Sequence, residues 1–404
     1  MKFCCVVMGE NTMHNFKYYT PTKVLFGKGT EKQVGILVKE QKCKKVLIHY
    51  GTGSVVKTGL LDKVKAALDT ENISWVELGG AVPNPRLSLV YEGIALAKKE
   101  KVDFILAVGG GSALDSAKAI GYGVYNEGDV WEFYDRKRQA DGCLPVGVVL
   151  TMAATGSEMS QSSVITKEEG LIKRGYSSDY GRPVFAIMNP ELTFTLPDYQ
   201  TACGCTDILM HSMERYFVAG DTMELTDTLA EALMRTVIKY SLVLEKNPNN
   251  YEARAEIMWA GSLSHNGLTG CGASAVDFAT HGLEHELGGL YDVAHGAGLA
   301  ALWGSWARYV YKDCLHRFYR FATQVMEVEE NENKEKVALK GIEKMEEFFK
   351  QIHMPISLTE LGVFPTEEEM KLMAHKCSIA SGGKKGSAKV LVEEDMLAIY
   401  RMAK

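Results

Sequence analysis

The chain has 404 residues, of which 46% are hydrophobic and 24% are charged, as is typical of a soluble globular protein long enough for two domains. Its net charge of −6 provides no basic surface for nucleic acid or for anionic membranes. No stretch approaches the roughly 18 uninterrupted apolar residues of a membrane-spanning helix, and the apolar run near the N-terminus is too short for a secretory signal.

Short β-branched runs alternate with helical patterns in the first half of the chain. This alternation, with glycine-rich turns between the elements, predicts a doubly wound, mostly parallel α/β sheet. Residues 1–14 are expected to form a short extension ahead of it. The predicted strands are 23–27, 44–51, 73–78, 103–111, 144–151 and 183–190, and the predicted helices are 60–71, 86–101 and 112–124.

The glycines Gly109 to Gly111 follow a predicted strand directly, and a predicted helix opens at Ser112. Successive glycines let the backbone approach a ligand, and the free N–H groups of a helix start favour a pyrophosphate. The stretch matches neither the G-x-G-x-x-G fingerprint nor a Walker loop, so a tight strand-to-helix turn is the alternative. A second polar stretch offers the hydroxyls of Thr151, Thr155 and Ser160 to the same ligand.

The second half of the chain has long segments with helical periodicity and almost no β-branched runs, which predicts an all-helical domain. We expect an α/β domain at 15–198 and a helical domain at 199–404, with a ligand site in the cleft between them. The periodic segments are 221–245, 251–269, 276–290 and 298–326, followed by a charged stretch at 327–350 that we interpret as a solvated helix face.

The nine cysteines are odd in number and scattered. This pattern favours a reducing cytosol over a disulfide framework, so we expect a cytoplasmic protein in which the cysteines fill space as small apolar residues. Cys203 and Cys205 are separated by one residue, a spacing typical neither of zinc fingers nor of thioredoxin-like motifs.

Two helical runs carry ligand-type side chains one turn apart. Asp207 and His211 share one helix face, His281 and His285 share another, and His295 follows a Gly-Gly turn. One carboxylate and several imidazoles suit Fe²⁺ or Zn²⁺, and the lack of thiolate ligands argues against a structural zinc site. For any one of these histidines, an ordinary core or surface role is the alternative.

Four motifs together resemble the iron-containing (group III) alcohol dehydrogenases, and in particular their branch of butanol dehydrogenases and NADPH-dependent aldehyde reductases. The motifs are "PNPRLSLV", "GGGSALDSAKAIG", "CTDILMHSMERYF" and "HGLEHELGGLYDVAHGAGLA". The resemblance extends from about residue 15 to the C-terminus. It implies a fold similar to dehydroquinate synthase, with a nucleotide-binding α/β domain, a helical metal-binding domain, and one catalytic Fe²⁺ or Zn²⁺ in the cleft.

The resemblance also implies roles for individual residues. The substrate would be a primary alcohol or aldehyde such as butanol or butanal, and the protein would be a homodimer. His285 would be an additional active-site histidine that relays a proton, not a ligand. The implied metal ligands are Asp207, His211, His281 and His295; the implied pyrophosphate loop contains Gly110, Gly111, Ser112 and Asp115; and other implied cofactor contacts are Asn84, Thr151, Thr155, Ser160 and Lys173.

The end of the strand at 44–51 bears on the choice of cofactor. Family members that use NAD place an aspartate there, whereas this chain has Gly51. An acid would repel the 2′-phosphate of NADPH, while Gly51, Gly53 and Ser54 offer N–H groups, a hydroxyl and space. We therefore expect NADP(H) to be preferred over NAD(H); the alternative is that Gly51 only serves a turn and both cofactors bind.

Two other functions are weighed. A lyase of the dehydroquinate synthase type would need a cluster of Arg and Lys around the metal, and apolar residues flank the metal motifs here. A non-catalytic nucleotide-binding sensor would have lost at least one metal ligand, and none is missing.

Overall fold

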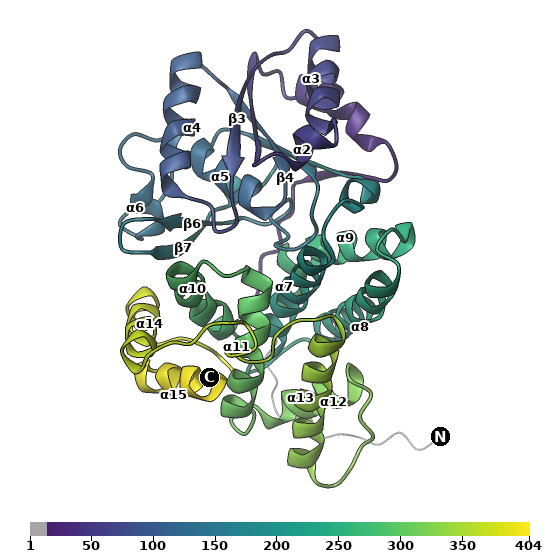
Figure 1. Ribbon diagram of the computed structural model, residues 1–404, viewed down its shortest axis with the longest axis vertical. Coiled ribbons are helices and arrows are strands. Elements are labelled where there is room, and N and C mark those ends of the chain that lie inside the picture. Colours follow the sequence, from purple (N-terminus) through teal and green to yellow (C-terminus); the bar gives the residue numbers. More distant parts are fainter. Residues whose placement is uncertain (1–13) are drawn as a thin grey trace.

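A computed structural model describes residues 14–404 and shows an α/β half stacked on a helical half (Figure 1). The predicted N-terminal extension, residues 1–14, lies outside the described residues except for its last position. Within the described chain, none of the helices combines the length and apolar character needed to span a membrane.

The core of the first half is a six-stranded sheet in the order β1-β8-β5-β4-β2-β3, and every pair of neighbours is parallel. All six predicted strands occur, so the predicted doubly wound fold class is confirmed. The strands are β1 (Lys23–Phe26), β2 (Lys45–Gly51), β3 (Ser74–Ala81), β4 (Phe104–Gly109), β5 (Val146–Leu150) and β8 (Phe185–Met188).

Helices cover both faces of this sheet, and Figure 1 shows α3 and α4 on opposite sides of it. In β4, Phe104, Leu106 and Val108 belong to the core under α1 and α3. Ile105 and Ala107 belong to the core under α4 and α5. Burial on both faces explains why the strand is a continuous apolar run. The helices are α1 (Val34–Glu40), α3 (Leu60–Thr70), α4 (Leu87–Glu100) and α5 (Gly111–Tyr125), with short α2 (Ser54–Lys57) and α6 (Trp131–Tyr134).

An antiparallel hairpin, β6 (Ser162–Lys167) and β7 (Ile172–Ser177), was not predicted from the sequence. Both strands are short and rich in polar residues, so they lack a clear apolar alternation. The chain reverses at Gly170 and Leu171, whose φ angles are 81° and 49°. β7 packs against α10 (Ala279–Tyr291) of the helical half, which makes the hairpin part of the contact between the two halves.

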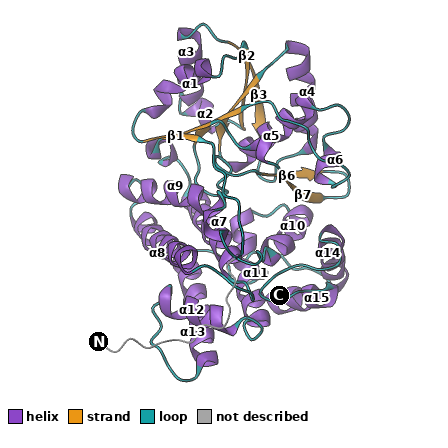
Figure 2. Cartoon of the chain, turned by 180° about the vertical axis from the view of Figure 1, so that it is seen from behind, coloured by secondary structure: helices purple, strands orange, loops and turns teal. Residues whose placement is uncertain are grey.

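The second half is all-helical, as Figure 2 shows, and α7 and α11 lie in its core. The predicted helix at 298–326 is two helices: the chain turns at 311–314, where neither glycine nor proline marks the break. The helices are α7 (Asp198–Tyr216), α8 (Glu224–Lys246), α9 (Tyr251–His265), α10, α11 (His295–Val310), α12 (Leu315–Gln324), α13 (Lys334–Gln351), α14 (Glu367–Ala380) and α15 (Glu393–Ala403); 3₁₀ turns occur at Thr30–Gln33, Asp179–Gly181, Pro190–Thr193 and Leu268–Gly270.

The charged stretch at 327–350 forms most of α13, whose two faces differ. Ile342, Met345 and Phe349 are buried in the helical core, while the lysines and glutamates of the opposite face are largely accessible. The solvated face was therefore predicted correctly, but the helix also contributes an apolar face to the core.

A buried ion pair joins α8 to α12. The guanidinium of Arg317 donates to both carboxylate oxygens of Asp227, at 2.6 and 2.7 Å, and its Nε donates to the carbonyl of Tyr216. Both charged side chains are almost fully buried. Because a charge in such a position needs its partner, this contact fixes how α12 packs on α7 and α8.

Asp227→Ala should lower the free energy of unfolding by about 3 kcal/mol, because the guanidinium of Arg317 would remain buried without its carboxylate. The measurement is the urea midpoint followed by circular dichroism. Glu367→Ala is the matched control: it removes an exposed pair with Arg401 and should lower the free energy of unfolding far less. Equal destabilisation by the two substitutions would contradict the assignment.

Candidate active site

A cleft of about 450 Å³ lies between the two halves. Its lining comes from the loops after β3, β4 and β5, from the hairpin, and from α7, α9 and α10. A cleft of this volume is in the range of small-molecule sites, and it is where two domains meet, which is a common place for them. All of the predicted metal ligands and His285 contribute to its lining.

Asp207 is the centre of the predicted metal site. Its Oδ1 lies 3.4 Å from Nδ1 of His211, 3.5 Å from Nε2 of His281 and 3.6 Å from Nε2 of His295. The donor atoms of Asp207, His281 and His295 all lie within 4.8 Å of one another, whereas His211 is next to this group but not part of it. The structure thus brings three predicted ligands together and places the fourth beside Asp207.

The donor atoms themselves show that a cation fits here. Asp207 Oδ1, His211 Nδ1 and His281 Nε2 are buried and have no hydrogen-bond partner in the described structure. Buried polar atoms normally have partners, so unpartnered atoms that converge on one point indicate a missing ligand. A carboxylate with imidazoles is a donor set that both Fe²⁺ and Zn²⁺ accept.

Two buried glutamates hold the imidazoles of this centre. Glu214 bonds Nδ1 of His281, and Glu284 bonds Nδ1 of His295. Each bond fixes the ring and leaves Nε2 directed at Asp207, which is how ligand histidines are usually oriented. Burial lowers the pKa of His281, but the carboxylates of Glu214 and Asp207 outweigh it and raise this pKa to about 9. The surroundings of His281 therefore stabilise a positive charge.

Neither glutamate was predicted from the sequence, although a signal existed. Glu214 follows His211 by three residues and Glu284 follows His281 by three, so each lies on the same helix face as a predicted ligand. His265, at the end of α9, was also missed. Its ring centroid lies 3.9 Å from that of His211, and no spacing in the sequence connects the two.

His285 lies one turn beyond His281 on α10 and faces the cleft without joining the metal group. Its ring centroid is 6.0 Å from that of His295 and 6.5 Å from that of His281. Burial and the nearby charge of Lys173 lower the pKa of His285 well below its ordinary value. The imidazole is therefore neutral over the physiological range.

The predicted cofactor residues divide into two groups. Gly110 and Thr151 are just outside the cleft lining, and Gly51, Gly53 and Ser54 lie beyond it at the end of β2. The residues that the structure places in the lining are Asn84, Gly111, Ser112, Asp115, Thr155, Ser160 and Lys173.

The glycine loop is shaped by packing as well as by its position at the cleft. A Cβ at Gly111 would lie 2.5 Å from the side chain of Thr155, and a Cβ at Gly110 would lie 3.0 Å from that of Met152. The loop after β5 therefore requires glycine at these positions whether or not a ligand is bound. The start of α5, with Ser112 in its first turn, still faces the cleft and offers N–H groups there.

Several of the lining residues are bonded to other parts of the protein. Asp115 accepts hydrogen bonds from the hydroxyl of Ser157 at 2.6 Å and from the amide of Val164 at 2.9 Å. Burial raises the pKa of this carboxyl group. The structure thus gives Asp115 a role in holding the loop after β5 against β6.

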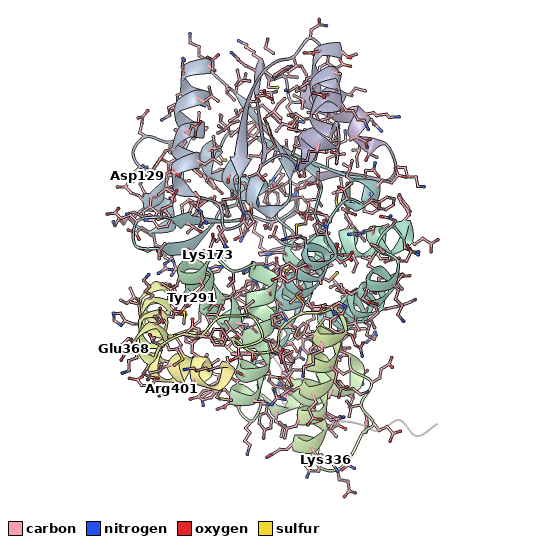
Figure 3. All side chains as sticks on the ribbon, in the orientation of Figure 1. Asp129, Lys173, Tyr291, Lys336, Glu368 and Arg401 are labelled. Atoms are coloured by element: carbon pink, nitrogen blue, oxygen red, sulfur yellow. The ribbon has the colours of Figure 1, made fainter. Side chains whose placement is uncertain are left out.

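Lys173 and Asn84 join the two halves of the molecule. Lys173, labelled in Figure 3, lies on β7 and donates to Glu284 at 3.0 Å. Asn84 donates to the carboxylate of Asp292 at 2.9 Å, and Arg86 bonds the other oxygen of Asp292 at 2.7 Å. Glu284 also bonds the predicted ligand His295, and Asp292 precedes His295 by three residues. These predicted cofactor residues therefore also support the predicted metal site.

The end of β2 leaves room for a side chain. Gly51 pairs with Ala81 of β3, and a Cβ at Gly51 would be in ordinary contact with the Ala81 carbonyl oxygen, at 3.4 Å. Its φ angle is not in the left-handed region, so its backbone does not require glycine. Gly53, in contrast, has a φ of 149°, and α2 begins directly after it at Ser54.

Comparison with known proteins covers nearly the whole chain. The family described as "Iron-containing alcohol dehydrogenase" matches residues 21–190, and the "Fe-containing alcohol dehydrogenase family, C-terminal" region matches residues 201–404. NADH-dependent butanol dehydrogenase A of Clostridium acetobutylicum is 39% identical, over 96% of this chain and 99% of the relative. NADPH-dependent aldehyde reductase YqhD of Escherichia coli is 36% identical, over 87% and 90% respectively.

A solved structure agrees with this relationship. The crystal structure of NADH-dependent butanol dehydrogenase A from Thermotoga maritima superposes with a TM-score of 0.93 and 39% identity, and the match covers 97% of this chain and 99% of the other. The chain therefore belongs to the iron-containing alcohol dehydrogenase family, within its branch of butanol dehydrogenases and aldehyde reductases, and is an oxidoreductase of alcohols and aldehydes.

Proposed function

We propose that this enzyme reduces small aldehydes to primary alcohols with NADPH, and catalyses the reverse oxidation, at one divalent metal. The observation that carries the proposal is the convergence of Asp207, His281 and His295 within 4.8 Å in the same cleft as the start of α5. We assign the fourth ligand position to His211, whose Nδ1 is 3.4 Å from Asp207 Oδ1. When bound, Fe²⁺ or Zn²⁺ would polarise the carbonyl oxygen, and the nicotinamide would supply the hydride.

The residues of the chain hold and orient these groups. Glu214 and Glu284 fix the rings of His281 and His295, and Lys173 balances the charge of Glu284. Burial favours the neutral form of Glu284, but His295 and Lys173 lower its pKa to about 2, so the group stays an anion at neutral pH. His285 faces the same cleft as a neutral imidazole, which can accept a proton on one nitrogen and donate from the other.

The cofactor preference rests on the end of β2. We assign the pyrophosphate to Gly110, Gly111 and Ser112, and the adenosine ribose to the region of Gly51, Gly53 and Ser54. The space at Gly51 and the absence of a carboxylate there support NADPH over NADH. The similar proteins differ in this respect, because one of the two relatives is named as NADH-dependent and the other as NADPH-dependent.

We also propose that the enzyme is a cytoplasmic homodimer whose two domains divide near residue 198. All described cysteines are free thiols, which supports a reducing compartment. The last strand of the sheet ends at Met188 and α7 begins at Asp198, which supports the domain boundary.

Among the described residues β1 is an edge strand with one unpaired side, which supports pairing with a second subunit there.

His281→Ala should abolish metal binding and reduce turnover more than about 100-fold, because it removes a ligand at the centre of the group. NADPH affinity should be unchanged, since the proposed nucleotide contacts lie in the α/β half. Metal content is measured by mass spectrometry and NADPH binding by fluorescence titration. His375→Ala, which changes a half-exposed histidine on α14, is the control and should keep both metal and activity. Stoichiometric metal in the His281 variant would disprove the site.

His285→Ala should keep its metal and lose rate by about 100-fold, because proton transfer by a positioned group contributes about this much. Added imidazole should restore part of the rate in this variant and none in His281→Ala. The assignment of His285 as a proton relay fails if the variant loses metal to the same extent as His281→Ala.

Gly51→Asp should shift the ratio of kcat/KM for NADPH and NADH about tenfold towards NADH, since like charges at close range cost on the order of 1 to 4 kcal/mol near a protein surface. Gly51→Ala is the matched control, because it adds the same Cβ without the charge and should leave the ratio nearly unchanged. A wild-type enzyme that prefers NADH, or equal ratios for the two variants, would show that this strand end does not contact the ribose.

A further inference from the structure

The cleft contains four basic side chains, and three of them have partners. The ammonium of Lys173 is bound to Glu284 at 3.0 Å, and the guanidinium of Arg182 is bound to Asp179 at 2.9 Å. Arg215 donates to the main-chain carbonyl of His211 at 2.7 Å. The fourth is Lys385.

Lys385 lines the cleft, but its ammonium has no hydrogen bond or ion pair to any residue in the described part of the chain. The buried carboxylates of α10 bond other cations and not Lys385: Glu284 bonds Lys173, and Oε1 of Glu286 bonds Arg174 at 2.7 Å. An unpaired cation in a partly desolvated site is costly unless an anion joins it. The charge of Lys385 is therefore available to a ligand.

The main chain at Lys385 is held firmly against α10. Its N–H and carbonyl both bond Leu391, at 3.0 and 2.7 Å, in the segment between α14 and α15. The next residue, Gly386, turns with a φ of 98°. Asp277, just before α10, accepts from the amides of Ser387 and Ala388 at 2.6 and 2.8 Å. The position of the lysine is thus set by contacts that do not involve its charge.

The aliphatic stem of the Lys385 side chain packs across α10 beside the proposed metal ligand His281. A Cβ on Gly282 would lie 3.3 Å from Cε of Lys385, and Gly282 directly follows the ligand His281. The absence of a side chain at Gly282 makes room for the apolar stem, and a lysine in this arrangement packs its stem and leaves its ammonium free.

We propose that Lys385 binds a carboxylate at the far end of the substrate, so that the preferred substrates are aldehydes that also carry a carboxylate. This inference rests on the proposed aldehyde reductase function and adds the substrate class. In the reaction, the aldehyde carbon gains a hydride from the reduced nicotinamide, its oxygen gains one proton, and the carboxylate is unchanged. The product is a hydroxy acid, and the nicotinamide is oxidised by two electrons.

The test compares succinic semialdehyde with its methyl ester, which has nearly the same shape but no charge. The metal-loaded wild type should prefer the acid in kcat/KM by about tenfold, as expected for one charge-assisted hydrogen bond. Lys385→Met keeps the stem and removes the charge, so it should lose this preference while butanal reduction stays within about twofold. Lys385→Arg should retain the preference, and Lys384→Met, which changes the exposed neighbour, should behave as wild type.

Binding provides a readout that does not depend on turnover. Calorimetry with succinate, which has no aldehyde to reduce, should show about tenfold weaker binding to Lys385→Met than to wild type. Equal losses of kcat/KM on the acid and the ester in Lys385→Met would assign Lys385 a packing role and overturn the proposal. Unchanged kinetics in this variant, or a wild type that prefers the ester, would also overturn it. Failure of the wild type to reduce butanal would instead refute the proposed function, and succinate binding would still decide whether Lys385 binds carboxylates.

Discussion

The convergence of Asp207 and the imidazoles where three helices cross is the constraint on which the rest of the helical half depends. The donor atoms can lie within 4.8 Å of one another only if α7, α10 and α11 approach closely. α11 meets α7 at Gly296, where any Cβ would collide with the main chain of Cys203. Gly204 meets the carbonyl oxygen of Ala153, after β5, in the same way. Residues without any chemistry of their own therefore fix where the ligands lie.

The same site is coupled to the α/β half through buried charge. Glu284 is shared by His295 and by Lys173, which belongs to the hairpin β6–β7. Because Glu284 is fully buried and its anionic form depends on both partners, the hairpin and the metal ligand are held in one arrangement. Asn84 adds a second link through Asp292, three residues before His295. Side chains that line the predicted nucleotide side of the cleft thus also hold the predicted metal ligands in place.

How much the sequence predicts depends on whether a feature is local. The six parallel strands were predicted from short apolar runs, which in β4, β5 and β8 reflect burial along the whole strand. The hairpin at 162–177 is polar and was missed. The break at 311–314 has no glycine or proline, so tertiary packing alone decides it. In the site, the spacing of four residues revealed the pairs Asp207–His211 and His281–His285. Spacing of three residues from a predicted ligand marks Glu214 and Glu284, but it does not show which histidine of another helix each one bonds. No spacing marks His265.

The two specificities proposed for this enzyme lie in different halves of the molecule. Gly51 is at the end of a strand in the sheet, and Lys385 is in the segment between the last two helices. Each is proposed to act through one charge, absent in the first case and present in the second. Relatives can therefore share the metal site and the fold over nearly their whole length while differing in cofactor. Under these proposals, single positions decide the cofactor and the substrate, and the overall fold does not.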